Sequence, residues 1–368
     1  MSKSYNITEK LHEGSETIVY RGVRNIDNLP VVVKAPKNNV PHPREIAKLT
    51  HQFEIIKDIK IPGIITAYEM ERNQDSARLI MEDFNGRSLQ QILSERTFTV
   101  EEVLQIGIRL AETLSILHKQ NIIHKDIKPH NIIVNLSTGE VKITDFGIAT
   151  RINHELKTNA PPSMLEGTLA YISPEQTGRM NRSIDHRSDL YSLGVTLYEM
   201  ITGVLPFQSN DPLELVHSHI ARRPVPPSDV YPSIPTVVSD IIMKLLAKNA
   251  EDRYQQADGL KADLQLCLDR LRTHGEISPF PLGKHDLSDG FHIPQKLYGR
   301  EQELEILMNA FEQVSEGQCK FVLVSGYSGV GKSALVNEIH KPVVRERGYF
   351  ISGKFDQYRR NMPYASLL

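Results

Sequence analysis

The sequence predicts an α+β fold for most of the chain and a short α/β segment at its end. The first residues, 5–35, have the pattern of short strands joined by tight turns, whereas residues 100–117 repeat apolar side chains at helical spacing. At 321–325 an apolar strand pattern runs directly into a glycine-rich turn and a helical pattern. Strands followed by helices indicate α+β, and a strand, loop and helix in succession indicate α/β. The 368 residues suffice for two such units.

The composition is that of an ordinary globular protein. Hydrophobic residues make up 40% and charged residues 24% of the chain, and the net charge is −2. This balance gives no reason to expect a nucleic acid or an acidic membrane as a partner. The cysteines Cys267 and Cys319 are far apart, which favours a reducing compartment over a disulfide framework. We expect a cytoplasmic protein, because no apolar run could span a bilayer and the first residues lack a secretion signal.

The strongest functional signal lies in the stretch from Ile123 to Asn131 and in the tripeptide Asp-Phe-Gly at residues 145–147. Asp126, Lys128 and Asn131 are spaced so that one loop presents a carboxylate, a cation and an amide together. Phosphoryl transfer from a nucleotide needs a base for the acceptor hydroxyl, a cation on the transferred phosphate and ligands for Mg²⁺. Any one of these residues would also fit a polar turn between strands. Their joint occurrence in this order instead predicts a phosphoryl-transfer site.

These motifs resemble the catalytic loop and the metal-binding segment of eukaryotic-type (Hanks-type) protein kinases, with Lys125 where that family usually has Arg. The resemblance implies a two-lobed protein kinase fold that uses ATP and Mg²⁺. It implies that Asp126 is the catalytic base, that Lys128 contacts the γ-phosphate, and that Asn131 and Asp145 hold the metal. The position of Lys128, two residues after Asp126, favours Ser/Thr over Tyr in a protein substrate.

The first strands resemble the nucleotide-binding strands of the kinase family. The hairpin around Gly14 resembles the glycine-rich loop, although His12 and Thr17 fill the other two glycine positions and a plain hairpin would explain it as well. The β-branched run that ends in Lys34 resembles the strand whose lysine contacts the α- and β-phosphates. By this resemblance Gly14, Val19 and Lys34 bind the nucleotide.

A helix is predicted over residues 43–57, where kinases place a glutamate that pairs with the strand lysine. Counting back from the Pro62-Gly63 turn puts that position at Gln52, and Glu54 lies nearly opposite on the helical turn. Either the helix is shifted and Glu54 pairs with Lys34, or Gln52 gives Lys34 a neutral hydrogen bond. A neutral bond is about half as strong as a charge-assisted one.

An apolar run that ends near Glu82 predicts a buried strand leading into a hinge. By the resemblance, backbone groups from Glu82 to Phe84 hold the adenine, and Met81 forms the wall behind it. A methionine at such a place is more often a packing residue than a specificity residue.

A long polar connection after residue 147 resembles a kinase activation segment and ends at Glu175, in a Ser-Pro-Glu tripeptide. Thr168 lies where Ser/Thr kinases carry a threonine that bonds the catalytic aspartate. Thr158 and Ser163 are the candidate phosphorylation sites of this segment. Because the ammonium of Lys125 cannot form the planar two-point contact that Arg makes with phosphate, we expect activity to depend weakly on such phosphorylation.

Helices are predicted on both sides of this connection. Thr99 and Glu102 form a capping box that begins a helix with a core-facing apolar stripe. A segment that is apolar on all sides begins at Asp189, which predicts a buried central helix whose aspartate must be paired. By the resemblance, Asp189 braces the backbone of the catalytic loop and Arg253 pairs with Glu175.

The end of the chain carries a second nucleotide motif. Residues 273–296 are rich in proline and glycine and predict a linker. Residues 326–333, Gly-Tyr-Ser-Gly-Val-Gly-Lys-Ser, form a complete Walker A motif between a strand pattern and a helix pattern. Its backbone N–H groups and lysine hold phosphates, and its serine binds Mg²⁺. The residues expected to bind this nucleotide are Gly326, Gly329, Gly331, Lys332 and Ser333.

The resemblance thus divides the chain into a protein kinase domain, a linker and the first part of an AAA-type P-loop NTPase domain. The predicted ranges are 1–272 for the kinase (N-lobe about 1–84, C-lobe about 85–272), 273–296 for the linker and 297–368 for the NTPase part. This order resembles cyanobacterial-type signalling proteins in which a Ser/Thr kinase precedes an ATPase module, a sensor region and a histidine kinase. It implies further C-terminal domains of a longer protein as partners.

Two other functions are compatible with these motifs. A pseudokinase that binds nucleotide and relays a signal would explain the sparse glycine loop and Gln52, but the presence of Lys34, Asp126, Asn131 and Asp145 argues against it. Alternatively, the kinase-like part is the input domain of a P-loop NTPase switch.

Overall fold

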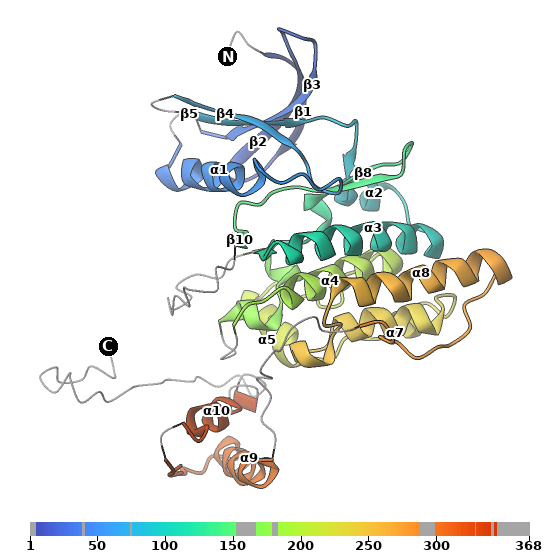
Figure 1. The fold of residues 1–368 in the computed structure, drawn as a ribbon. Helices are drawn as coiled ribbons and strands as arrows, with labels where there is room; N and C mark the ends of the chain where they lie inside the picture. The colour runs from blue at the N-terminus through green and yellow to red at the C-terminus, as the bar shows by residue number, and fades with distance from the viewer. Residues whose placement is uncertain are drawn as a thin grey trace, which may run out of the picture.

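The structure of the chain is a computed structural model that describes residues 5–38, 41–73, 76–151, 167–178, 183–286, 299–327, 329–339 and 342–343. Its first part has a sheet-rich lobe stacked on a helical lobe, and the chain passes from one to the other after β5 (Figure 1). The predicted α+β, two-lobed fold is therefore confirmed.

The first lobe is an antiparallel sheet with a helix, α1, packed against β4 and β5. The strands lie in the order β1-β2-β3-β5-β4, with the bounds Tyr5–Glu13 (β1), Thr17–Arg24 (β2), Pro30–Pro36 (β3), Ala67–Asn73 (β4) and Ser76–Glu82 (β5). β-Branched residues suit the pleated centre of a sheet, and Val31 on β3 is fully buried. The helix α1, Pro43–Ile56, buries Leu49 and Ile56 in the core.

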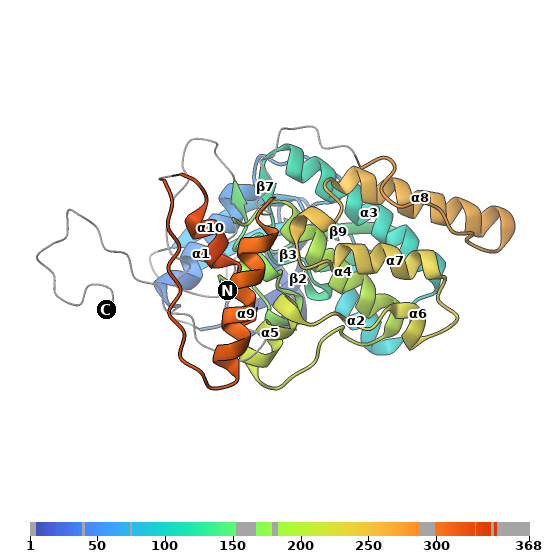
Figure 2. The ribbon, with the colours of Figure 1, turned by 90° about the horizontal axis from the view of Figure 1, so that it is seen from below.

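The second lobe is a stack of helices, in which α3 lies beside α8 and α4 beside α7 (Figures 1 and 2). Their bounds are Leu89–Glu95 (α2), Val100–Lys119 (α3), Arg187–Thr202 (α4), Pro212–Ala221 (α5), Pro227–Val230 (α6), Thr236–Leu245 (α7) and Ala257–His274 (α8). The predicted capping box is present: Thr99 accepts from the Glu102 N–H at 3.2 Å, and Glu102 accepts from the Thr99 N–H at 2.9 Å. As predicted, α4 is buried on nearly all sides.

Short strands hold the loop that carries Asp126. Two sheets form around it, one from β7 and β10 and one from β6, β8 and β9. The bounds are Arg87–Ser88 (β6), Ile122–Ile123 (β7), Ile132–Asn135 (β8), Glu140–Ile143 (β9) and Thr150–Arg151 (β10). Ile143 on β9 exchanges backbone hydrogen bonds with Gly63 and Ile65, which connect α1 to β4. This ladder ties the loop region to the sheet-rich lobe.

Residues after α8, which begin the segment predicted to be a linker, pack back onto the helical lobe. Phe280 packs against its hydrophobic core. Asp286 accepts hydrogen bonds from the backbone N–H groups of Gln255 and Gln256 at 2.8 and 2.9 Å, directly before α8 begins. Sequence patterns missed this contact because it joins irregular segments that have no period.

Replacing Asp286 with Ala is expected to lower the free energy of unfolding by about 1–2 kcal/mol, because two N–H groups before α8 lose their acceptor. Urea unfolding of the full chain, followed by circular dichroism, measures the change. The exposed neighbour Lys284 provides the control, since Lys284→Ala removes a side chain of this segment without removing an acceptor. Equal unfolding midpoints for the two variants would contradict the prediction.

The last part of the described chain contains two helices that contact each other, α9 (Glu301–Ser315) and α10 (Lys332–Asn337). The prediction of a strand at residues 321–325 is wrong: these residues have no regular secondary structure, and Phe321 and Leu323 are 91% and 78% exposed. A strand needs neighbours to pair its backbone and cover its side chains. The described residues of this part offer no such neighbour. None of the helices in the described ranges is long and apolar enough to cross a membrane.

Candidate active site

A cleft of about 910 Å³ is lined by residues of both lobes. It gathers most of the residues that the sequence marked for the kinase site. Those that line it are Gly14, Val19, Lys34, Gln52, Met81, Glu82, Phe84, Asp126, Lys128, Asn131, Asp145 and Thr168. Strands β1, β2, β3 and β5 and helix α1 supply the upper wall, and the loop between β7 and β8 supplies the floor.

On the floor of the cleft, the carboxylate of Asp126 is surrounded by donors. Lys128 Nζ lies 2.7 Å from Asp126 Oδ2, and Asn131 Nδ2 donates to the same oxygen at 2.9 Å. The backbone N–H and the hydroxyl of Thr168 both lie 3.1 Å from Asp126 Oδ1. Lys128 Nζ also donates to Thr168 Oγ1 at 2.5 Å. A carboxylate held by donors on both oxygens is fixed in orientation, as a catalytic proton acceptor must be.

The backbone of this loop is fixed from below by Asp189, at the start of α4. Its carboxylate accepts from the backbone N–H groups of His124 and Lys125 at 2.9 and 2.8 Å, and from His118 Nε2 at 2.9 Å. Burial by itself would raise the pKa of Asp189, but these donors lower it by a larger amount, so the net pKa lies below its ordinary value. Lys125 has a left-handed backbone conformation, with φ 67°. The hydrogen bond from its N–H to the Asp189 carboxylate can hold this conformation in place.

Asp145 faces Lys34 across the cleft, with 2.8 Å between Lys34 Nζ and Asp145 Oδ1. Burial by itself would raise the pKa of Asp145, but the ammonium of Lys34 lowers it by a larger amount, so the pKa lies below its ordinary value. The carboxylate therefore stays ionised, and 38% of its side chain remains exposed. With the amide of Asn131, it offers the oxygen donors that Mg²⁺ prefers alongside phosphates, so these residues fit the implied metal.

The partner of Lys34 on α1 is Gln52. Gln52 Oε1 accepts from Lys34 Nζ at 3.1 Å, and the side chain of Gln52 is buried. Glu54 instead pairs with Lys57, the residue after the end of α1, and has a 54% exposed side chain. Of the two alternatives, the structure therefore has the neutral hydrogen bond.

Ion pairs hold the hinge after β5 on both sides. Lys142 on β9 contacts both carboxylate oxygens of Glu82 at 2.9 Å, and Arg21 on β2 lies 2.6 Å from Asp83. Asn135 Nδ2 donates to the backbone oxygen of Phe84 at 2.8 Å. The side chains of Glu82 and Asp83 are thus held in contacts within the protein, and the backbone oxygen of Phe84 is bonded to Asn135. Met81, behind the hinge, is buried.

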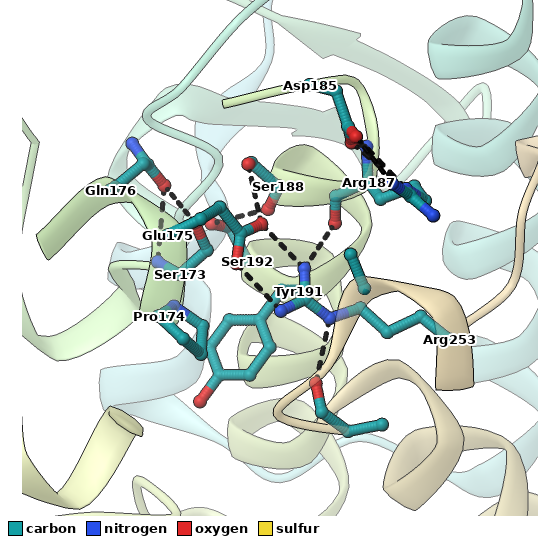
Figure 3. A network of polar contacts seen from close by, with 12 residues as sticks. Ser173, Pro174, Glu175, Gln176, Asp185, Arg187, Ser188, Tyr191, Ser192 and Arg253 are labelled. Atoms are coloured by element: carbon teal, nitrogen blue, oxygen red, sulfur yellow. Dashed lines mark hydrogen bonds and ion pairs between the residues drawn. The ribbon is translucent and has the colours of Figure 1, made fainter. Parts of the chain in front are cut away.

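A buried ion pair lies below the cleft, between Glu175 and Arg253 (Figure 3). The two guanidinium nitrogens lie 2.7 and 2.8 Å from the two carboxylate oxygens, and Ser188 donates to Glu175 at 2.7 Å. Arg253 also stacks over the ring of Tyr191 at 4.9 Å. The neighbouring Gln176 donates to the backbone oxygen of Lys125 at 2.8 Å, which links this network to the loop that carries Asp126.

Three histidines near the cleft were not assigned a role from the sequence. His12 and His130 both line the cleft, and their ring centroids lie 6.1 Å apart. Burial, then Lys128 and His12, lower the pKa of His130, so that it is largely neutral at pH 7. His51 on α1 bonds the backbone oxygen of Ala149 at 2.7 Å. Only the position of His12, in a glycine slot, signalled an unusual residue.

Several predicted residues are not among those that line this cleft. Thr158 and Ser163 lie outside the described residues. In the Walker A segment, Lys332 Nζ donates to the backbone oxygens of Gly326 and Tyr327, both at 2.8 Å. Ser333 lies in the first turn of α10.

A two-lobed fold with these residues gathered in one cleft defines the class of protein-kinase-like proteins. The chain matches the model of the protein kinase domain over residues 5–264 and that of an AAA ATPase domain over residues 296–368. It therefore belongs to the protein kinase family, with an AAA ATPase segment after the kinase domain. The predicted order of a Hanks-type kinase and an AAA-type module is confirmed.

Curated relatives agree with this family. Hybrid signal transduction histidine kinase G of Dictyostelium discoideum is 31% identical over an alignment of 356 residues, which covers 73% of this chain and 10% of that protein. A probable serine/threonine-protein kinase of Clostridium perfringens is 34% identical over 267 residues, or 72% of this chain and 38% of that one. Serine/threonine-protein kinase PknB of Mycobacterium tuberculosis is 35% identical over 208 residues, or 55% and 33%. The chain spans well under half the length of each of these relatives.

Proposed function

We propose that this chain is an active serine/threonine protein kinase that transfers the γ-phosphate of ATP to a protein hydroxyl. One observation carries the proposal: Asp126, Lys128, Asn131 and Thr168 form a single hydrogen-bonded group on the floor of a cleft whose wall carries the Lys34–Asp145 pair. In a protein that does not catalyse phosphoryl transfer, the reaction would not require these groups to remain in contact.

In the proposed mechanism, the oxygen of the substrate hydroxyl attacks the γ-phosphorus while Asp126 accepts the proton of that hydroxyl. Lys128 stands beside both Asp126 and Thr168, where it contacts the transferred phosphate. The bond from the γ-phosphorus to the β-phosphate oxygen breaks, and ADP leaves with Lys34 near its phosphates. Asn131 and Asp145 are the residues that would hold Mg²⁺, which when bound neutralises charge on the phosphates.

The adenine is proposed to lie against the hinge. Backbone groups from Glu82 to Phe84 hold it, with Met81 behind it and Val19 above it, since all of these line the cleft. Gly14 at the β1–β2 turn covers the phosphates. A Cβ at this position would meet the backbone oxygen of Thr17 at 3.4 Å, an ordinary van der Waals contact, so the space within the turn does not by itself require glycine.

The segment after the kinase domain is proposed to be the start of an ATPase module that binds a second nucleotide through Lys332 and Ser333. The kinase domain is taken as residues 1–272, the linker as 273–296 and the NTPase part as 297–368. The relatives are much longer than this chain, which supports further C-terminal domains as partners. A cytoplasmic location, without a nucleic-acid or membrane partner, fits the composition.

The test is to incubate the full chain with Mg²⁺ and radiolabelled ATP, with a generic basic protein as substrate, and to identify the labelled amino acids. Label on serine and threonine, in the chain or the substrate, is the expected result. The rival function is a pseudokinase, which the neutral contact of Gln52 with Lys34 favours. Saturable ATP binding without any labelled product would establish that rival.

A further inference from the structure

Helix α1 is tied to the cleft lysine by an unusually weak contact. The uncharged Oε1 of Gln52 accepts one hydrogen bond from Lys34 Nζ at 3.1 Å, while Lys34 pairs by charge with Asp145 at 2.8 Å. Gln52 is only 1% exposed, and its Nε2 is buried without a hydrogen-bond partner among the described residues. Leaving a buried donor unpaired costs stability.

A second contact ties the same helix to the segment that carries Asp145. His51 Nε2 lies 2.7 Å from the backbone oxygen of Ala149, four residues after Asp145. A carbonyl oxygen can only accept, so Nε2 carries the hydrogen whether the ring is neutral or protonated. Ala149 is 2% exposed and belongs to the same buried cluster as Phe146, so its carbonyl is a rigid anchor.

Another polar contact from α1 reaches across to the β1–β2 turn, but it is weak. Lys48 lies 2.7 Å from Glu16, and both side chains are about half exposed, at 52% and 50%. Exposed pairs of this kind contribute little, because water and salt screen them. His51 is also an exposed residue, but its partner Ala149 is buried, and among the described residues its bond is the polar contact that joins α1 to the segment after Asp145.

We propose that His51 is a positioning residue that holds α1 against the Asp145 segment and so takes over the task of the ion pair that Gln52 cannot form. The inference rests on the proposed kinase function. Together with the core packing of Leu49 and Ile56, His51 fixes the place of Gln52, and through Gln52 that of Lys34. Because Nε2 donates in both protonation states, the contact works across the physiological pH range.

The first experiment compares His51→Ala with His51→Gln in the full chain. Gln places an amide N–H near the position of Nε2, whereas Ala leaves the Ala149 carbonyl without this donor. We expect His51→Ala to lower kcat about tenfold, as the loss of one well-placed hydrogen bond does, with the KM for ATP little changed. His51→Gln should restore most of the rate. Arg44→Ala, at an exposed position in the first turn of the same helix, is the matched control and should keep the wild-type rate.

The second experiment asks whether His51 replaces a missing ion pair. In a Gln52→Glu background, a charged contact with Lys34 ties α1 to the cleft independently. His51→Ala should then cost less than about twofold, against about tenfold with Gln52 present. An equal loss in both backgrounds would overturn the proposal, because a purely local packing role would not depend on residue 52.

A readout without catalysis separates this inference from the proposed function. Amide hydrogen exchange over residues 49–56 should be faster in His51→Ala than in wild type and normal in His51→Gln. If wild type transfers no phosphate but exchange responds in this way, the kinase function fails and the role of His51 stands. If wild type is active and His51→Ala matches it in rate and in exchange, the role of His51 is refuted.

Discussion

Replacing Asp145 with Asn is expected to reduce phosphate transfer by about a thousandfold or more while the fold stays intact. The variant loses a charged metal ligand, and a loss of about 4 kcal/mol of transition-state stabilisation corresponds to that factor. Asn keeps the size of the side chain and tolerates the left-handed backbone at this position, φ 66°. The measurement is labelled phosphate transferred per minute by wild type and variant, with the melting temperature as the check on folding.

Asp269→Asn is the control for this experiment, because Asp269 is an exposed aspartate on α8, away from the cleft. It should transfer phosphate at the wild-type rate. Equal incorporation by Asp145→Asn and wild type would mean that the activity comes from a contaminant or from another site, and the assignment of this cleft would then fall.

Most of the fold and the membership of the cleft follow from local sequence patterns. The capping box of Thr99 and Glu102, the all-apolar segment after Asp189 and the order of Lys34, Asp126 and Asp145 each depend on neighbours in the chain. Such signals survive in a single sequence because spacing along a helix or a loop translates directly into position in space.

What could not be predicted depends on contacts between distant segments. The choice between Gln52 and Glu54 depends on the rotation of α1, which the packing of Leu49 and Ile56 sets. The bond from His51 to a backbone oxygen leaves no side-chain signature at residue 149. The apolar run at 321–325 has the pattern of a strand, but a pattern cannot supply the partner strands that would make it one.

Replacing Arg253 with Met is expected to lower the free energy of unfolding by about 3–5 kcal/mol at pH 7, because it leaves Glu175 charged, buried and without its partner. In wild type the pair is fully buried, with two parallel contacts at 2.7 and 2.8 Å (Figure 3). Met fills much of the arginine volume, but it also leaves the backbone oxygens of Ala247, Arg187 and Lys248 without the donors that Arg253 supplies, so the comparison with the double variant is needed to isolate the lost charge. Removing both charges, by combining Glu175→Gln with Arg253→Met, should cost clearly less than Arg253→Met alone.

The stabilities of these two variants are expected to depend differently on pH. In wild type, burial by itself would raise the pKa of Glu175, but Arg253 and Ser188 lower it by a larger amount, so the pKa lies below its ordinary value. The stability from this carboxylate is therefore complete above the unfolded pKa of about 4.3, and it is lost only as the pH falls through the lower folded pKa. Without Arg253 the effect of burial dominates and raises the pKa of Glu175, so protonation of this carboxyl reduces the destabilisation of Arg253→Met as the pH falls.

The measurement is urea unfolding at pH 7.5 and pH 5. The gap in free energy of unfolding between wild type and Arg253→Met should narrow from pH 7.5 to pH 5, whereas the gap between wild type and the double variant, which lacks the carboxyl, should stay constant. A gap for Arg253→Met that is equally wide at both pH values would show that lost packing, and not an unpaired carboxylate, causes the destabilisation.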